Sequence, residues 1–290
     1  LAWRCALSGR VHAFAADNGM LYAAVDDRRV YAIDHRGRVH WRTGLGEVPG
    51  RELNTAPEGM LTLTSRGGSI FLLNERGGII WERDAGEGYA GSTSAPNGTL
   101  FLASGQQLQA VSHTGRLRWQ RRLPADPSAP PVYSARYGLL VPCSDGFLHS
   151  YSPGSILQWE FLAAGIPGRP IARREGIYLP NEAGTLALVS ADGHLIRQFR
   201  NIGAVRFTAP AAKLGTPGEG VLAATRKEVL HVSLSGGRKR IALLPFAPLA
   251  GSAAEDRLAF FGRQGAVAVV SPASGESAAL QIPPATALPV

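Results

Sequence analysis

Residues 32–41, AIDHRGRVHW, form a stretch that recurs along the chain. It returns as LLNERGGIIW at 72–81, as AVSHTGRLRW at 110–119 and as SYSPGSILQW at 150–159. Each copy has a turn, a small residue four positions before its tryptophan, and apolar residues between them. A fixed period of about 40 residues is typical of solenoids, propellers and arrays. The repeat therefore decides the fold, and no single segment does.

The tryptophans mark this repeat from the start of the chain. All five lie 38 to 40 residues apart: Trp3, Trp41, Trp81, Trp119 and Trp159. After the last of them, the turn glycine continues the period at Gly193, Gly236 and Gly275, so that seven units are visible. We expect each tryptophan to fill the gap between its own sheet and a neighbouring one, which is a structural role.

Each repeat divides into four short strands. In the first repeat, the candidate strands are residues 10–16, 20–25, 30–34 and 38–42, separated by turns rich in Asp, Asn and Gly. Glycine and asparagine suit such tight turns because they adopt a positive φ at low cost. No stretch of ten residues has a convincing helical period. Each repeat therefore predicts one antiparallel sheet.

Four strands in each of seven units predict an all-β chain, a seven-bladed β-propeller of four-stranded antiparallel blades. A parallel β-helix is the alternative, but its repeats are shorter and lack a hairpin of this length. We predict one propeller domain over residues 1–280, followed by a Pro-rich tail at 281–290. Residues 276–280 are a weak candidate for the outer strand of the last blade. We therefore expect the N-terminal strand, residues 1–5, to complete that blade.

The charge balance indicates the kind of partner. The chain carries 30 basic and 22 acidic residues, a formal net charge of +8. This excess predicts attraction to acidic proteins or anionic surfaces. The basic pairs are short and have no interleaved aromatic residues, so we expect no nucleic acid partner. No apolar run approaches the length of a membrane span.

Residues 21–41, LYAAVDDRRVYAIDHRGRVHW, closely resemble the repeat of PQQ-type (quinoprotein) β-propellers. Asp34, Gly37 and Trp41 match the strand end, the turn and the last strand of that repeat. The resemblance covers nearly the whole chain and weakens towards the C-terminus. In the next three units the position of Asp34 is taken by Asn74, Ser112 and Ser152.

The resemblance implies one of two kinds of protein. Quinoprotein dehydrogenases hold pyrroloquinoline quinone and calcium, are longer, and usually have two adjacent cysteines. This chain has two separate cysteines and no cluster of Asp, Glu and Asn suited to calcium. The other kind is non-catalytic, such as the periplasmic scaffold lipoprotein of the outer-membrane β-barrel assembly machinery. This second kind is the closer likeness.

We therefore expect a non-enzymatic scaffold of the bacterial cell envelope without a cofactor, acting in outer-membrane protein assembly. It would be monomeric by itself and bind acidic or envelope-associated proteins. The resemblance also implies a periplasmic or otherwise extracytoplasmic protein, with a membrane anchor outside this sequence as an open alternative. The start at Leu1 rather than at Met fits a processed chain but does not by itself indicate the compartment. The alternative is an enzyme or sensor that binds a small ligand or quinone in the central channel.

The sequence offers no motif for catalysis or for a metal. Cys5 and Cys143 are expected to be small buried hydrophobes. His35, His113 and His194 fall in or beside the same turn of different repeats, and no histidine pair has metal-ligand spacing. No nucleophile elbow or phosphate loop is present. A hydrolase assembled from loops of several blades stays an open alternative.

Arginines recur where the first strand of a repeat begins. If the blades are equivalent, four of them lie near one rim of the channel: Arg10, Arg51, Arg169 and Arg206. The guanidinium group presents a rigid fork of donors that suits carboxylate or phosphate. One interpretation is a rim that binds anions or an acidic partner. The other is that these arginines bond backbone carbonyls of neighbouring loops.

Overall fold

The computed structural model describes residues 5, 7–17, 19–84, 86, 88–203, 207–210, 220–248, 250–254, 257–261, 266–271 and 276–281. The chain divides into two compact units, residues 1–145 with 150–157, and residues 146–149 with 158–290. Across the described part of the chain, no helix has the length and apolar character that a membrane span needs.

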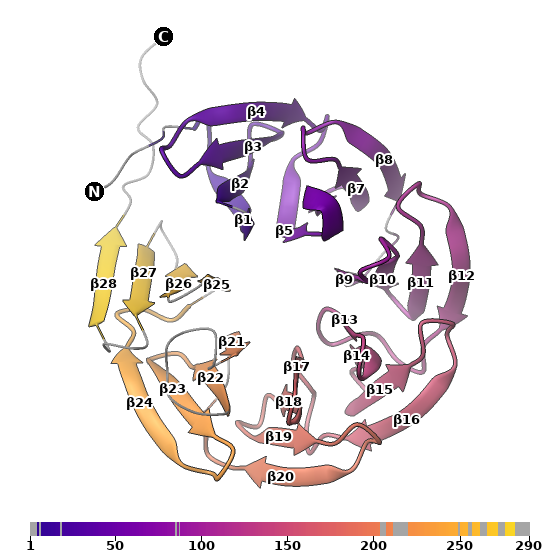
Figure 1. Cartoon of the computed structure of the whole chain (residues 1–290), viewed down its shortest axis with the longest axis vertical. Helices are drawn as coiled ribbons and strands as arrows, with labels where there is room; N and C mark the ends of the chain where they lie inside the picture. The colour runs from indigo at the N-terminus through magenta and orange to yellow at the C-terminus, as the bar shows by residue number, and fades with distance from the viewer. Residues whose placement is uncertain are drawn as a thin grey trace. The chain divides into compact units, whose positions relative to one another are not determined.

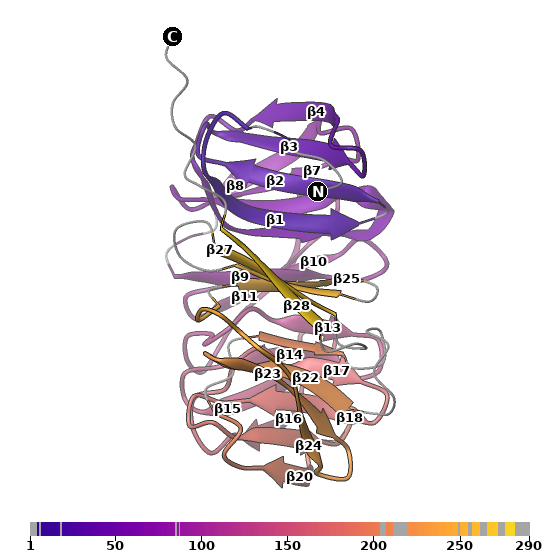
Figure 2. The ribbon, with the colours of Figure 1, turned by 90° about the vertical axis from the view of Figure 1, so that its left-hand side faces the viewer.

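The described strands form seven antiparallel sheets of four strands each, and within each sheet the strands follow one another in chain order (Figure 1). In Figure 2 the first sheet is seen with β1 to β4 side by side. The strands of the first four sheets are β1(Val11–Asp17), β2(Met20–Val25), β3(Arg29–Asp34), β4(Val39–Gly44); β5(Pro49–Thr55), β6(Leu61–Ser65), β7(Ser69–Leu73), β8(Ile79–Asp84); β9(Tyr89–Ser94), β10(Leu100–Ser104), β11(Gln107–Val111), β12(Leu117–Arg122); β13(Val132–Ser134), β14(Gly138–Pro142), β15(Phe147–Tyr151), β16(Leu157–Leu162).

The last three sheets have the same order. Their strands are β17(Ile171–Arg173), β18(Gly176–Pro180), β19(Leu186–Val189), β20(Leu195–Phe199); β21(Phe207–Pro210), β22(Gly220–Ala224), β23(Glu228–Ser233), β24(Arg238–Leu243); β25(Ala250–Ala254), β26(Arg257–Phe261), β27(Ala266–Ser271), β28(Glu276–Gln281). A short 3-10 helix, η1(Pro57–Gly59), joins β5 to β6. The predicted all-β, propeller-like repeat of four-stranded sheets is confirmed at this level.

The two middle strands of a sheet are buried on both faces. Successive side chains of a strand point to opposite sides, so one strand can contribute side chains to two different cores. On β7, Phe71 packs with residues of the first sheet, such as Val30. Its neighbour Leu72 packs instead with residues of the third sheet, such as Leu102. The second sheet thus contributes one face to the core that it shares with the first sheet and one to the core that it shares with the third, which explains the near-continuous apolar runs on its strands.

The same arrangement recurs inside each unit. In the first unit, Phe101 and Leu108 of the third sheet pack with Val141 of the fourth. In the second unit, Leu222 and Val229 of the sixth sheet pack with Phe260 of the seventh. Burying one such side chain stabilises the fold by about 1.5–3 kcal/mol, so most of the stability comes from these cores between sheets.

The prediction for the outer strand of the last sheet was wrong. Its fourth position is taken by β28, which pairs with β27 from Ser271–Glu276 to Ala266–Gln281. A hairpin between consecutive segments closes a far shorter loop, at a lower entropy cost, than pairing with the other end of the chain. Cys5 and Leu7 instead pack against buried residues of β2 and β3 in the first sheet. Trp3 lies outside the described residues.

The predicted C-terminal tail overlaps the described part of the chain at one residue. Gln281, its first residue, belongs to β28. Residues 282–290 lie outside the described part of the chain.

Candidate functional site

The tryptophans of the outer strands link each sheet to the next. The indole Nε1 of Trp41, on β4, donates to the carbonyl oxygen of Glu75 at 2.9 Å. Three further indoles make the same bond to the corresponding turn of the following sheet: Trp81 to His113 at 3.1 Å, Trp119 to Pro153 at 2.8 Å and Trp159 to Ala191 at 2.8 Å. The half-exposed rings therefore tie sheets together, and those of Trp41, Trp81 and Trp119 also pack against the cores between sheets.

The turn between the last two strands of a sheet, which receives the indole in the second to fifth sheets, is closed by its own polar side chain. Oδ1 of Asp34 accepts hydrogen bonds from the backbone N–H of Arg36 at 2.8 Å and of Arg38 at 2.9 Å. These backbone donors, that of Arg38 first, lower the pKa of Asp34 from 3.8 to about 2. Asn74, Ser112, Ser152 and Ser190 accept from the backbone four residues on in the same way. Any short side chain with an acceptor oxygen serves here, which explains the Asp, Asn and Ser exchange.

The link between sheets continues after the tryptophans stop. Arg197 lies four residues after Gly193, where the earlier repeats have tryptophan. Its guanidinium donates to the carbonyl oxygen of Ser235, in the turn of the next sheet, at 2.7 Å. Arginine thus keeps the donor that tryptophan supplies in the first repeats.

The predicted arginine rim is described only in part. Arg10 is exposed just before β1, and its backbone N–H donates to Oδ1 of Asp26 at 2.7 Å. Arg51 lies on β5, and Arg169 is exposed two residues before β17. Arg206 lies outside the described residues. The three described arginines thus lie at or near the start of the first strand of their sheets, as the repeat predicts.

A cavity of about 640 Å³ lies at one end of the second sheet. The β6–β7 turn, with Arg66 and two glycines, forms one wall, and Asp84, Gly86, Gly88 and Tyr89 form another. Glu52 of β5 lines it as well. Burial, followed by the nearby Glu52 carboxylate, raises the pKa of Tyr89 well above 10.0, so this phenol keeps its proton near neutral pH. The cavity was not predicted, because its lining residues come from several strands and turns of ordinary composition.

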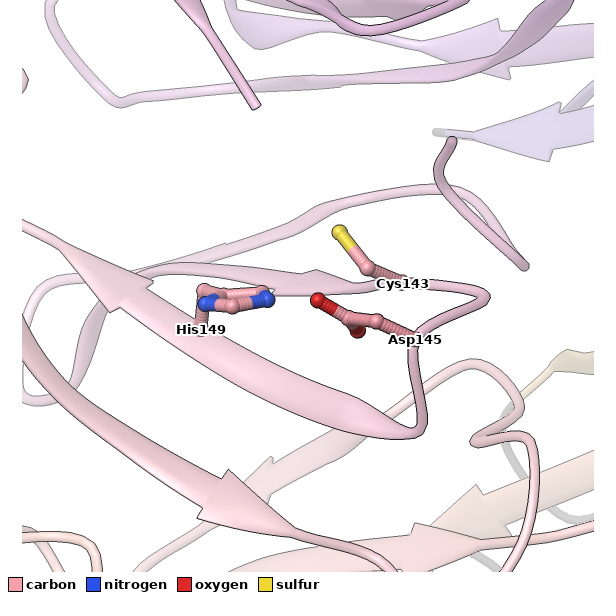
Figure 3. A group of neighbouring side chains, drawn as sticks. All are labelled: Cys143, Asp145 and His149. Atoms are coloured by element: carbon pink, nitrogen blue, oxygen red, sulfur yellow. The ribbon is translucent and has the colours of Figure 1, made fainter. Parts of the chain in front are cut away.

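A second group missed by the sequence analysis lies on the β14–β15 hairpin. Figure 3 shows Cys143, Asp145 and His149, with one nitrogen of the imidazole and a carboxylate oxygen directed towards each other. One ligand atom from each of the three lies within 4.8 Å of the other two. Cys143 and His149 are buried, and Asp145 is exposed. The available signal was the local pattern Cys-x-Asp-x-x-x-His across a turn, which keeps the three residues close together along the chain.

A protein-family profile described as "Outer membrane protein assembly factor BamB" matches residues 66–279. The chain belongs to the BamB family. The match covers every sheet from the third to the sixth, the last two strands of the second and most of the seventh, so family membership rests on the repeats themselves. No curated protein matches the chain.

Solved structures show how widely the fold is shared. BamB from Moraxella catarrhalis has a TM-score of 0.72 at 17% identity, covering 92% of this chain and 85% of that one. Sqt1 from Saccharomyces cerevisiae has a TM-score of 0.75 at 11% identity, covering 95% and 86%. A streptogramin B lyase has a TM-score of 0.65 at 13% identity, covering 92% and 93%. At these identities the likeness shows the fold alone.

Proposed function

We propose that this BamB-family chain is a non-catalytic scaffold of the bacterial cell envelope that binds a protein partner during outer-membrane protein assembly. The single observation that carries the proposal is the family match over residues 66–279. The proposal includes closure of the seven sheets into a seven-bladed ring with β28 as its last outer strand. Small-angle X-ray scattering tests the closure, because an open arc has a larger radius of gyration than a ring of equal length.

The sheets are built to present turns at a fixed spacing. In the first unit, Trp41, Trp81 and Trp119 each bond the turn of the following sheet. Such cross-links hold neighbouring sheets in register, so the loops at the other end of the sheets also keep a fixed spacing and a partner that binds there loses less entropy. A fixed spacing of loops is sufficient for a scaffold. An enzyme would also need reactive side chains that converge on one site.

The end of the sheets that carries Arg10 is the proposed binding end. Both backbone polar groups of Arg10 are held by Asp26. The N–H of Arg10 donates to Oδ1 of Asp26, and the carbonyl oxygen of Arg10 accepts from the N–H of Asp26 at 3.0 Å. The side chain is exposed at this fixed point. With a net charge of +8, the chain favours an acidic partner segment.

Photo-crosslinking in the bacterium that encodes the chain tests the proposal. A photoreactive residue at position 10 should capture a protein of the outer-membrane assembly machinery, identified by mass spectrometry. The matched control is position 76, an exposed arginine in the β7–β8 turn. Antiparallel pairing places that turn at the opposite end of the sheets from the start of β1. Equal capture at both positions, or capture of cytoplasmic proteins only, would refute the proposal.

The second candidate function is small-ligand binding, and the cavity of about 640 Å³ beside Glu52 and Tyr89 is the observation that favours it. This volume falls within the range of about 300–1,000 Å³ that small-molecule sites occupy. Native mass spectrometry of the chain purified from its own envelope fraction would detect a co-purifying ligand. Loss of that ligand in Tyr89→Phe would place it in the cavity, and a ligand unaffected by this change would place it elsewhere.

A further inference from the structure

We propose that Cys143, Asp145 and His149 bind a zinc ion at the β14–β15 turn. The three residues lie within one short stretch of chain, and their ligand atoms lie within 4.8 Å of one another (Figure 3). Thiolate sulfur, imidazole nitrogen and carboxylate oxygen are the ligands that Zn²⁺ takes in proteins. Neither the family match nor the predicted scaffold function assigns this group.

The spacing of the ligand atoms suits a tetrahedral site after a small closure. Zinc bonds of about 2.3 Å to sulfur and about 2.0–2.2 Å to nitrogen or oxygen place tetrahedral ligands about 3.3–3.7 Å apart. The three atoms therefore close by about 1 Å or slightly more. Asp145 is the exposed member of the group, and rotation of its side chain can supply much of this movement.

A carboxylate orients the histidine. Nδ1 of His149 lies 2.9 Å from Oε1 of Glu160 on β16. Histidines that bind metals usually bond a carboxylate through the other ring nitrogen, which fixes the ring and the tautomer. The pair therefore directs Nε2 as the ligand atom. His149 is only 1% exposed, so the ring is also held by packing.

The surroundings favour a bound cation. The carboxylates of Asp145 and Asp126 lie near Cys143 and place negative charge beside the group. The same negative charges lower the energy of a bound divalent cation. On binding, the thiol gives its proton to water and a sulfur–zinc bond forms. Three protein ligands leave the fourth position to a water molecule.

Metal titration of the whole chain tests the site. After removal of metals with a chelator, Zn²⁺ should raise the thermal midpoint at a one-to-one ratio, and Mg²⁺ should not. Co²⁺ in place of zinc should give the ultraviolet charge-transfer band of a cobalt–thiolate bond. Cys143→Ser should abolish this band, while Cys5→Ser, the matched control, should leave it unchanged. Equal bands in both variants, or no band in the native chain, would overturn the proposal.

Two further variants separate ligation from folding. Asp145→Asn changes an exposed residue, so it should fold normally and bind zinc more than about 100-fold more weakly. Glu160→Gln keeps an acceptor for His149 but lacks the charge, and should weaken zinc binding by about 10–100-fold. His113→Gln, in the β11–β12 turn, is the control for loss of a histidine. Unchanged zinc affinity in Asp145→Asn would contradict the assignment.

Discussion

Gly77 lies directly against the indole ring of Trp41 from the preceding sheet. A Cβ atom at residue 77 would come within 2.6 Å of Cε3 of Trp41, and the backbone there has a φ of +82°. Two separate features favour glycine at residue 77: the left-handed backbone conformation and the close contact with the indole ring. Gly115 and Gly193 meet Trp81 and Trp159 in the same way.

Gly77→Ala should destabilise the chain by about 2–5 kcal/mol, because overpacking adds to the strain of a left-handed alanine. Urea denaturation measures the change. Gly19→Ala is the matched control, since Gly19 has a φ of +76° and a Cβ atom added there would meet nothing within 4 Å. That control should cost only about 1–2 kcal/mol. Equal losses in the two variants would show that contact with Trp41 is not important.

Ser155→Gly should stabilise the chain. Ser155 takes the place of the turn glycine in the fourth sheet, and its φ is +71°, an unfavourable backbone for serine. Glycine removes a strain of about 1 kcal/mol. The expected result is a higher midpoint in urea at an unchanged slope. A lower midpoint would mean that the serine side chain contributes more than the strain costs.

The stability contribution of Asp34 should depend on acid pH. The folded pKa of about 2 lies below the value of 3.8 of an unperturbed aspartate, so the unfolded state binds more protons between these values. The contribution is fully present above about pH 4 and is lost as the pH falls through about 2. Urea denaturation at several pH values measures it. Asp34→Asn should lack this part of the acid dependence, and a difference from native that stays constant with pH would contradict the argument.

Charge reversal at the arginine rim should weaken partner binding. Arg10→Glu and Arg169→Glu, singly and together, should reduce affinity for the captured envelope protein by at least about tenfold, because each places a carboxylate opposite an acidic partner. The thermal midpoint should change by less than about 2 °C. Arg76→Glu, the same change in the β7–β8 turn, is the control. Binding by the double variant at native affinity would exclude these two arginines from the site.

The repeat made most of the fold predictable. Trp41 and Gly37 carry the period, and the apolar run around Phe71 and Leu72 is typical of a strand buried on both faces. The last sheet was harder, because residues 276–281, ESAALQ, have little apolar patterning on their own. Their place is set by pairing with β27, a tertiary effect that local sequence does not contain.

The candidate sites were less predictable. Arg197 occupies the tryptophan register, but nothing in its neighbours shows that a guanidinium will bond the next turn. Cys143 and His149 each resemble ordinary core residues when considered alone. Only the fold of the β14–β15 hairpin brings them together, and Glu160 on a third strand adds the orienting carboxylate. Such a site depends on which side chains the strands bring together, whereas the fold depends on the repeat of about 40 residues in the sequence.

The contacts between an indole or guanidinium and the following turn have a consequence for how such a chain can grow or shrink. The first five sheets each donate forward to a carbonyl in the turn of the following sheet, so duplication or deletion of one of these complete units leaves each of these donors with an acceptor. Removal of half a unit leaves one turn carbonyl without its donor and one donor side chain without its acceptor. Gene rearrangements in this family are therefore expected to respect whole units, with breakpoints between the outer strand of one sheet and the first strand of the next.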